Sequence, residues 1–268
     1  MQKKGRIMKI QFLVLSLLLS TAILAYENTY KLSVALVGMS MDYREYNDGG
    51  AILDSEKSSF SGIVGSEFIF DYTRVYENNN YAKVGIETLF LGGNTEYVGS
   101  YIGSNLGYGS LVSTTQNSIF DISGHYMYTH AFKNGLDFGY GLALGYRSWE
   151  RRLSSIQTEV YYWYSIRPRV ELAYNFLDFS IGGLAEYQYA IDPKMSATGF
   201  SSDFNLGSAN IAKLRIPLRY TLNNKTEFFV EYVYEQQIIE KSNVQDGFLE
   251  PDSTANNQYA KIGAVFKF

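Results

Sequence analysis

The sequence predicts an all-β protein, a ten-stranded antiparallel up-and-down transmembrane β-barrel, and two observations carry that prediction. Residues 136–147, LDFGYGLALGYR, place apolar or aromatic side chains at every even position and small or charged ones at every odd position. The same alternation recurs along the chain at hairpin spacing. It is the pattern of strands that turn one face to lipid and the other to a polar interior.

A soluble barrel of lipocalin type is the alternative fold. It would pack its apolar face inside, and small and ionic residues opposite that face in strand after strand are atypical of such a protein. The composition also favours the membrane barrel, with 24 Tyr, 24 Gly, 4 Pro and 16% aromatic residues. The absence of cysteine excludes disulfides and thiolate chemistry.

The N-terminus has the pattern of a secretory signal peptide. Four basic residues precede the apolar run 10–25, which ends in small residues, so residues 1–25 are expected to be removed. Either Met1 or Met8 fits as the start. A membrane anchor would need ~20 apolar residues, and this run is shorter. The barrel domain is then 26–268, with 19 basic against 27 acidic residues and a net charge of −8, which argues against a nucleic-acid partner.

Ten alternating segments follow, joined by short turns and longer loops in strict alternation. In an outer-membrane barrel the short turns are periplasmic and the longer loops lie outside the cell. The expected strands are 29–43, 60–72, 82–90, 118–129, 136–147, 159–174, 179–191, 209–220, 226–236 and 258–268. The expected turns are 77–80, 132–135, 175–178 and 222–225, and the expected loops are 47–59, 92–117, 149–158, 192–208 and 239–257.

Two strands contain local irregularities. In 29–43 the apolar set changes from even positions to Met39, Met41 and Tyr43, so we expect a β-bulge at Gly38. In 159–174, Pro168 removes a backbone donor from the ladder, so the pairing there should be weakened or bulged. The sheet as a whole must close, because an open edge in hydrocarbon would leave a row of backbone groups unpaired.

The inward positions of these strands collect charge of both signs. They predict an ionic network in the barrel interior, formed by Glu67, Lys83, Glu87, Asp121, His125, Arg147, Arg167, Arg169, Glu171, Glu186, Lys213, Arg215, Arg219, Glu227, Glu231, Glu235 and Lys261. The turn at 222–224 predicts that opposing residues in the hairpin 209–236 have numbers that sum to 446. That register sets Arg215 opposite Glu231 and Arg219 opposite Glu227, and the turn 175–178 sets Arg167 opposite Glu186.

The C-terminal strand carries a family resemblance. Its sequence, QYAKIGAVFKF, has apolar residues at alternate positions and ends with Phe266 and Phe268 on the outward face. It resembles the signal by which the assembly machinery recognises Gram-negative outer-membrane barrels, which implies that machinery as a partner and the outer membrane as the location. In strand number and length the chain is similar to the omptin proteases and to ten-stranded adhesin barrels.

Omptin activity would need paired aspartates and an Asp-His pair at the extracellular rim, and this sequence lacks that pattern. His125 falls in mid-strand on the inner face, where it is expected to form hydrogen bonds, and His130 lies near a turn. No motif indicates a catalytic site, a metal or a cofactor. The segment Trp149–Arg152 is the candidate contact for lipopolysaccharide phosphate, because arginine forks suit phosphate.

Two functions therefore remain open, with an outer-membrane hydrolase as the third. The first is a surface-interaction barrel with a filled, charged interior whose loops meet lipopolysaccharide, host or neighbouring cells. The second is a small pore for ions or small solutes. Ten strands lie between side-chain-filled small barrels and water-filled porins, so strand number does not decide between them.

Overall fold

The computed structural model describes residues 27–76, 78–100, 107–245 and 247–268, so the expected signal peptide lies outside the described residues. Every element of this described part is a β-strand. None of its segments is a helix long and apolar enough to cross a membrane.

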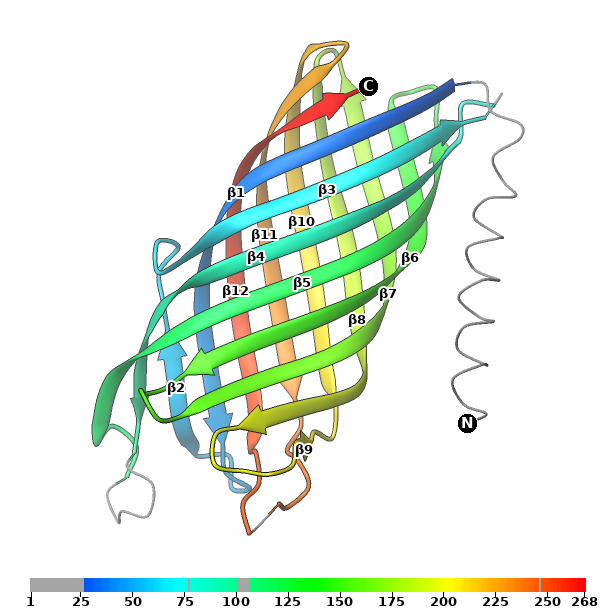
Figure 1. The fold of residues 1–268 in the computed structure, drawn as a ribbon. Coiled ribbons are helices and arrows are strands. Elements are labelled where there is room, and N and C mark those ends of the chain that lie inside the picture. The colour runs from blue at the N-terminus through cyan, green and yellow to red at the C-terminus, as the bar shows by residue number, and fades with distance from the viewer. Residues whose placement is uncertain (1–26, 77, 101–106, 246) are drawn as a thin grey trace, which may run out of the picture.

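Ten long strands and two short ones form one antiparallel sheet (Figure 1). The long strands are β1 (Glu27–Tyr46), β3 (Ile63–Val75), β4 (Tyr81–Gly99), β5 (Leu111–Ala131), β6 (Leu136–Arg152), β7 (Thr158–Phe176), β8 (Phe179–Ala197), β10 (Ala209–Asn223), β11 (Thr226–Ile239) and β12 (Asp252–Lys267). The short strands are β2 (Ile52–Lys57) and β9 (Phe204–Asn205).

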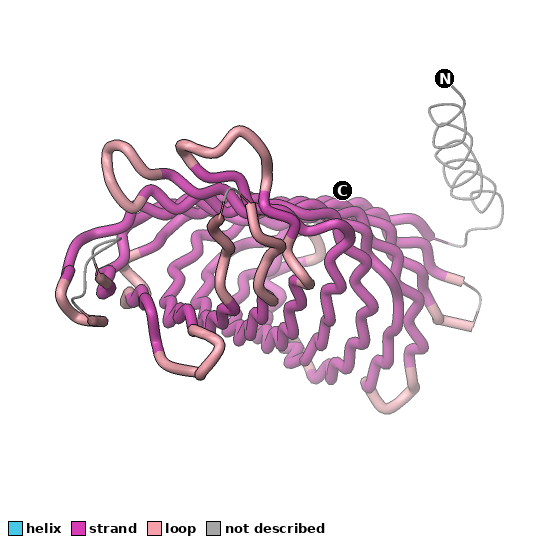
Figure 2. The backbone as a smooth tube through the Cα atoms, turned by 90° about the horizontal axis from the view of Figure 1, so that it is seen from below, coloured by secondary structure: helices cyan, strands magenta, loops and turns pink. Residues whose placement is uncertain are grey.

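The sheet closes into a barrel because its first and last strands pair. β1 and β12 are in register from Lys31 opposite Lys267 to Tyr46 opposite Asp252, without a shift. We call the end with the turns after β3, β5, β7 and β10 the short-turn end, and the opposite end the long-loop end; Figure 2 looks onto the long-loop end. The expected ten-stranded up-and-down barrel is confirmed.

The barrel has an apolar outside and a charged inside. Outward side chains such as Leu36 and Leu144 are 70% and 56% exposed, whereas the inward Arg147 and Glu235 are 1% and 0% exposed. A soluble barrel would show the reverse arrangement, so the lipocalin-type alternative is wrong. A closed sheet with this exterior satisfies the requirements of hydrocarbon, where backbone groups need partners within the protein.

The strands are longer than expected at the long-loop end. Most of the expected loop 92–117 is strand, because β4 runs to Gly99 and β5 starts at Leu111. The expected loop 47–59 contains β2, and the expected loop 149–158 begins with the end of β6. In these extensions most outward residues are polar, such as Thr114, Gln116 and Glu150, with the pair Val98 and Val112 as an exception. Backbone pairing therefore continues past the point where the regular apolar alternation stops.

The expected bulge at Gly38 is absent. β1 pairs with β12 and with β3 in unbroken register across this position, so Met39, Met41 and Tyr43 point into the barrel, where each is at most 2% exposed. The apolar residues change position because the interior changes character along the strand. At Pro168 the ladder between β7 and β8 is interrupted without a register shift, as its missing N–H requires.

Both predicted registers are wrong by two residues. In β10 and β11 the numbers of opposing residues sum to 448, so Arg215 lies opposite Val233, and Arg219 opposite Phe229. In β7 and β8 the opposing residue of Glu186 is Arg169, because the strands continue to a two-residue turn at Leu177–Asp178. A shift by two keeps every side chain on its face, so the inward charges remain inward.

Disulfide trapping distinguishes the observed register from the predicted one. Leu218 lies directly opposite Val230, whereas Ile216 is displaced by two residues. Directly opposed Cα atoms are ~4.5–5.5 Å apart, within disulfide range, and diagonal ones at ~7–8 Å are beyond it. Oxidation of the refolded protein should therefore crosslink the variant Leu218→Cys/Val230→Cys and leave Ile216→Cys/Val230→Cys reduced. The opposite result would restore the register that sums to 446.

Candidate functional site

The candidate site is the barrel interior, which is divided into regions of different chemistry along its axis. From the short-turn end these are an open vestibule, a belt of ion pairs, an apolar layer and a second buried ionic cluster at the long-loop end. Strand β6 crosses three of them in five residues, with Arg147 in the belt, Trp149 in the apolar layer and Arg151 in the second cluster.

The centre of the belt is Arg215, which contacts three carboxylates. Its guanidinium lies 2.6 Å from Glu87, 2.9 Å from Glu231 and 3.3 Å from Glu67. Lys261 completes the group, with Nζ at 2.6 Å from Glu67 and 2.9 Å from Glu231. The residues come from β3, β4, β10, β11 and β12, so the group joins strands that are distant in the barrel.

The rest of the belt continues the alternation of charge toward β6. Arg169 is bonded to Glu186 and lies 3.3 Å from Glu87. Glu235 receives hydrogen bonds from Arg147 and lies 3.2 Å from Lys213, and Asp121 lies 2.7 Å from Arg167. A cavity among Glu67, Arg215 and Tyr259 measures about 10 Å³, about the space of one water molecule.

Two glycines on the inner face make room for this chemistry. A Cβ at Gly145 would lie 2.4 Å from the Arg167 guanidinium. A Cβ at Gly85 would lie 2.1 Å from Asp71 Oδ1 and 2.7 Å from His125 Cε1. His125 Nε2 and that Asp71 oxygen form a hydrogen bond of 3.0 Å, so the inward glycines leave space for larger side chains of the facing strands.

An apolar layer lies between the belt and the long-loop end and fills the barrel there. It includes Met39, Ile63, Ile119, Trp149 and Trp163, each at most 2% exposed. Trp149 stacks on Tyr161 with ring centroids 5.2 Å apart. The sequence analysis missed this layer: Met39 was interpreted as part of a bulge and Trp149 fell within an expected loop. Ile63, Ile119 and Trp163 lie at inward positions of expected strands, where only the charged and polar residues were considered.

The second cluster surrounds Arg151, whose guanidinium is 1% exposed. It lies 2.8 Å from Glu45, 2.8 Å from Glu56 and 3.0 Å from Glu159. It also lies over the Tyr43 ring, 4.3 Å from the ring centroid. Glu250, from the loop between β11 and β12, accepts a hydrogen bond from Tyr161 at the same place. Three carboxylates thus contact one guanidinium, and the carboxyl group of Glu250 lies beside them on the Tyr161 hydroxyl.

This excess of acid changes the protonation of the cluster. Burial and the neighbouring Glu45 and Glu159 raise the pKa of Glu250 well above its usual value. Buried like charges cannot all ionise, so part of the cluster carries protons at neutral pH.

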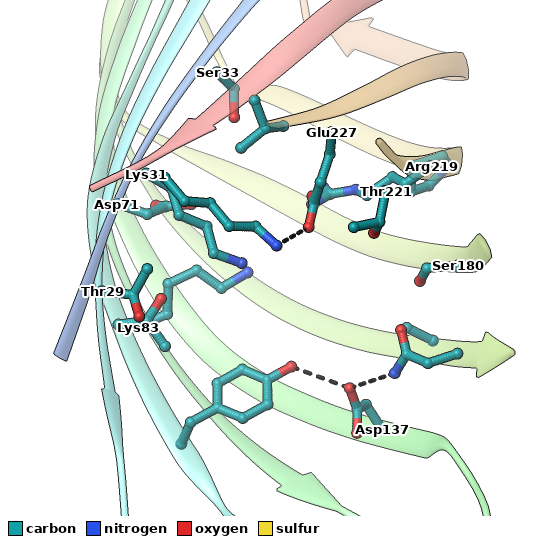
Figure 3. A pocket seen from close by; sticks show the side chains of 18 of the residues that line it. Thr29, Lys31, Ser33, Asp71, Lys83, Asp137, Ser180, Arg219, Thr221 and Glu227 are labelled. Carbon is teal, nitrogen blue, oxygen red and sulfur yellow. Dashed lines mark hydrogen bonds and ion pairs between the residues drawn. The ribbon is translucent and has the colours of Figure 1, made fainter. Parts of the chain in front are cut away.

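The vestibule at the short-turn end is a cavity of about 430 Å³ (Figure 3). Side chains of both charges line it, among them Lys31, Lys83, Asp137, Arg219 and Glu227. Lys83 lies 3.5 Å from Glu171, and Lys267 pairs with Glu227. The vestibule ends at the ionic belt, so its depth is limited by the Arg215 group.

The structure places every residue of the expected interior network on the inner face, buried or partly buried. It brings Arg215 and Glu231 together on a diagonal, pairs Arg167 with Asp121 in place of Glu186, and leaves Arg219 without an ion pair among the described residues. The sequence analysis missed Lys31, Asp71 and Lys267, although the alternation of β1, β3 and β12 already marked them as inward.

The expected phosphate contact at 149–152 is wrong for its first arginine. Trp149 and Arg151 are both 1% exposed and belong to the interior. Arg152 is exposed and lies 3.1 Å from Glu150. His125 is buried on the inner face. His130 packs edge-on against Tyr128 and beside Tyr140 on the outer face. Neither histidine is at the long-loop end.

The raised pKa of the loop residue Glu250 predicts a pH-dependent stability. Above a pH of about 4.3 the unfolded chain has lost the proton of this carboxyl group, whereas the folded state still holds it. Its stabilisation is therefore complete below that lower value and is lost as the pH rises through the raised pKa of the folded state. Relative to Glu250→Gln, the wild type should lose roughly 1 kcal/mol or more of unfolding free energy between pH 5 and 8. Urea unfolding followed by the fluorescence of Trp149 and Trp163 measures this, and a pH-independent difference would contradict it.

No protein-family model matches the chain, and no curated protein matches it. Among solved structures, the fold is similar to that of the outer membrane protease OmpT from Escherichia coli, with a TM-score of 0.53 and 13% identity over 91% of this chain and 97% of that chain. The translocator domain of the autotransporter NalP from Neisseria meningitidis matches with a TM-score of 0.44 and 11% identity, over 99% of this chain and 97% of that one. The likeness to OmpT shows the fold, that of an omptin-sized outer-membrane β-barrel.

Proposed function

We propose that this protein is an integral outer-membrane β-barrel with a closed interior, which acts through the surface of its long-loop end and does not conduct solutes. The observation that carries the proposal is the continuous filling of the interior by the ionic belt and the apolar layer. Ion pairs such as Arg147–Glu235 are at most 1% exposed, and the cavity among the belt residues is about the size of one water.

The membrane location is supported by the exterior. The outward side chains form an apolar surface around the barrel, with aromatic residues such as Tyr174, Phe179 and Tyr220 near the short-turn end. Aromatic belts of this kind mark membrane interfaces. The proposal adds outer-membrane lipid and lipopolysaccharide as partners of this surface, and the assembly machinery as a partner of the exposed Phe266 and Phe268.

A small pore is the second candidate, and the vestibule favours it, since this cavity of about 430 Å³ lies within the barrel interior at the short-turn end. The apolar layer argues against it, because ions would have to pass between tightly packed rings. We propose no enzymatic role, since the long-loop end of the described chain contains no histidine beside its buried acids.

Conductance separates the two candidates. The refolded mature protein should give no discrete channels in a planar bilayer, because both the belt and the apolar layer close the interior. The matched variant Trp149→Ala/Trp163→Ala opens the layer and leaves the belt intact, so it should also be silent. Regular single-channel steps in the wild type would establish the pore and reject the closed barrel.

The orientation can be tested with single cysteines, since the chain has none of its own. Ser154 and Ser201 are exposed in connections of the long-loop end, and Asn134 and Asn224 are exposed in short turns. An impermeant maleimide added to intact cells should label Ser154→Cys and Ser201→Cys but not Asn134→Cys or Asn224→Cys. Labelling of the second pair alone would reverse the orientation.

A further inference from the structure

The vestibule contains charged side chains of both signs that are not neutralised by an ion pair within its wall. Four basic and four acidic residues line it, so its formal charges cancel. Three of the acids are engaged: Glu227 by Lys267, Glu171 by Lys83, and Asp71 by His125. The remaining charges are unevenly placed, and their positions define what the cavity can hold.

Two cations have no carboxylate partner within ion-pair distance among the described residues. They are Lys31 on β1 and Arg219 on β10. Lys31 lies directly opposite Lys267 on one side, and opposite Asp71 on the other. Like charges directly opposite one another are unfavourable, and Asp71 already binds His125. This part of the wall therefore has an unused capacity to bind a carboxylate.

One acid has the complementary property. Asp137 on β6 receives hydrogen bonds from Tyr81 at 3.3 Å and Asn175 at 2.9 Å, both on Oδ2. Both donors are neutral, and Oδ1 receives no hydrogen bond from the described residues. In Figure 3 Asp137 lies apart from Lys31 and Arg219, and all three belong to the same cavity.

We propose that the vestibule binds a small zwitterion of the amino-acid or dipeptide type. Its carboxylate would meet Lys31 and Arg219, and its ammonium group would meet Asp137. A ligand with no net charge suits a cavity whose own charges cancel, whereas a simple anion would leave Asp137 without a cationic partner. The volume of about 430 Å³ lies within the range of small-molecule sites.

Calorimetry on the refolded mature protein in detergent tests the site without reference to membrane orientation or conductance. The probe is L-alanyl-L-alanine, compared with its N-acetyl and C-terminal amide derivatives. The free dipeptide should bind, and each blocked derivative should bind about tenfold more weakly or worse, because each loses a charge-assisted contact.

Matched variants assign the two ends of the ligand. In the double variant Lys31→Gln/Arg219→Gln, which removes both cations at the carboxylate end, the amide should bind as well as the free dipeptide. In Asp137→Asn the N-acetyl derivative should bind as well as the free dipeptide. Lys133→Gln, which changes an exposed lysine of the neighbouring turn, should bind like the wild type. Unchanged heat-modifiable gel mobility establishes that each variant remains folded.

Three results would overturn the proposal. They are the absence of dipeptide binding, equal binding of all three peptides, and binding of inorganic phosphate as tight as that of the free dipeptide, which would indicate an anion site only. None of them bears on whether the interior conducts, so the closed-barrel function is judged separately.

Discussion

Arg215 and its three carboxylates show the constraint on which the interior depends, the pairing of charge that the fold removes from water. A buried ion without a partner costs several kcal/mol, and the belt meets this cost by giving most groups more than one partner. Glu67 and Glu231 each contact both Arg215 and Lys261. These ion pairs connect strands that are not neighbours in the sheet, so they stabilise the barrel by contacts across its interior.

The same constraint explains the glycines. In a narrow barrel every inward position competes for a small cross-section, and an arginine that reaches across needs an empty place on the neighbouring strand. Gly145 provides it for Arg167, and Gly85 provides it for the pair Asp71–His125. Small residues opposite large ones along the inner face are therefore part of the packing, although in the sequence they are seen only as polar alternation.

The fold was predictable because its signal is repeated in every strand, as in Leu142 and Leu144 outside and Ala143 and Gly145 inside. The details failed where that signal changes. Met39 and Met41 are apolar and inward, which the alternation alone cannot distinguish from a bulge. The extension of β4 to Gly99 has only Val98 as an apolar residue on its outer face. The two register predictions failed because turn length depends on backbone conformation, such as the positive φ of 53° at Leu177. The cluster around Arg151 was not predictable because its acidic partners come from β1, β2 and β7, which the sequence does not show to be close to β6.

The seam between β1 and β12 also determines how such a barrel can form. Every residue of this ladder, from Lys31 with Lys267 to Tyr46 with Asp252, joins positions separated by most of the chain. Loops of that length close slowly, because the chain loses conformational entropy before the two strands form the contacts that compensate for this loss. Until β12 pairs with β1, the open sheet has two edge strands with unpaired backbone groups. During that time these edges can pair with the wrong strand. Closure is then a single late event, in which both edges disappear together.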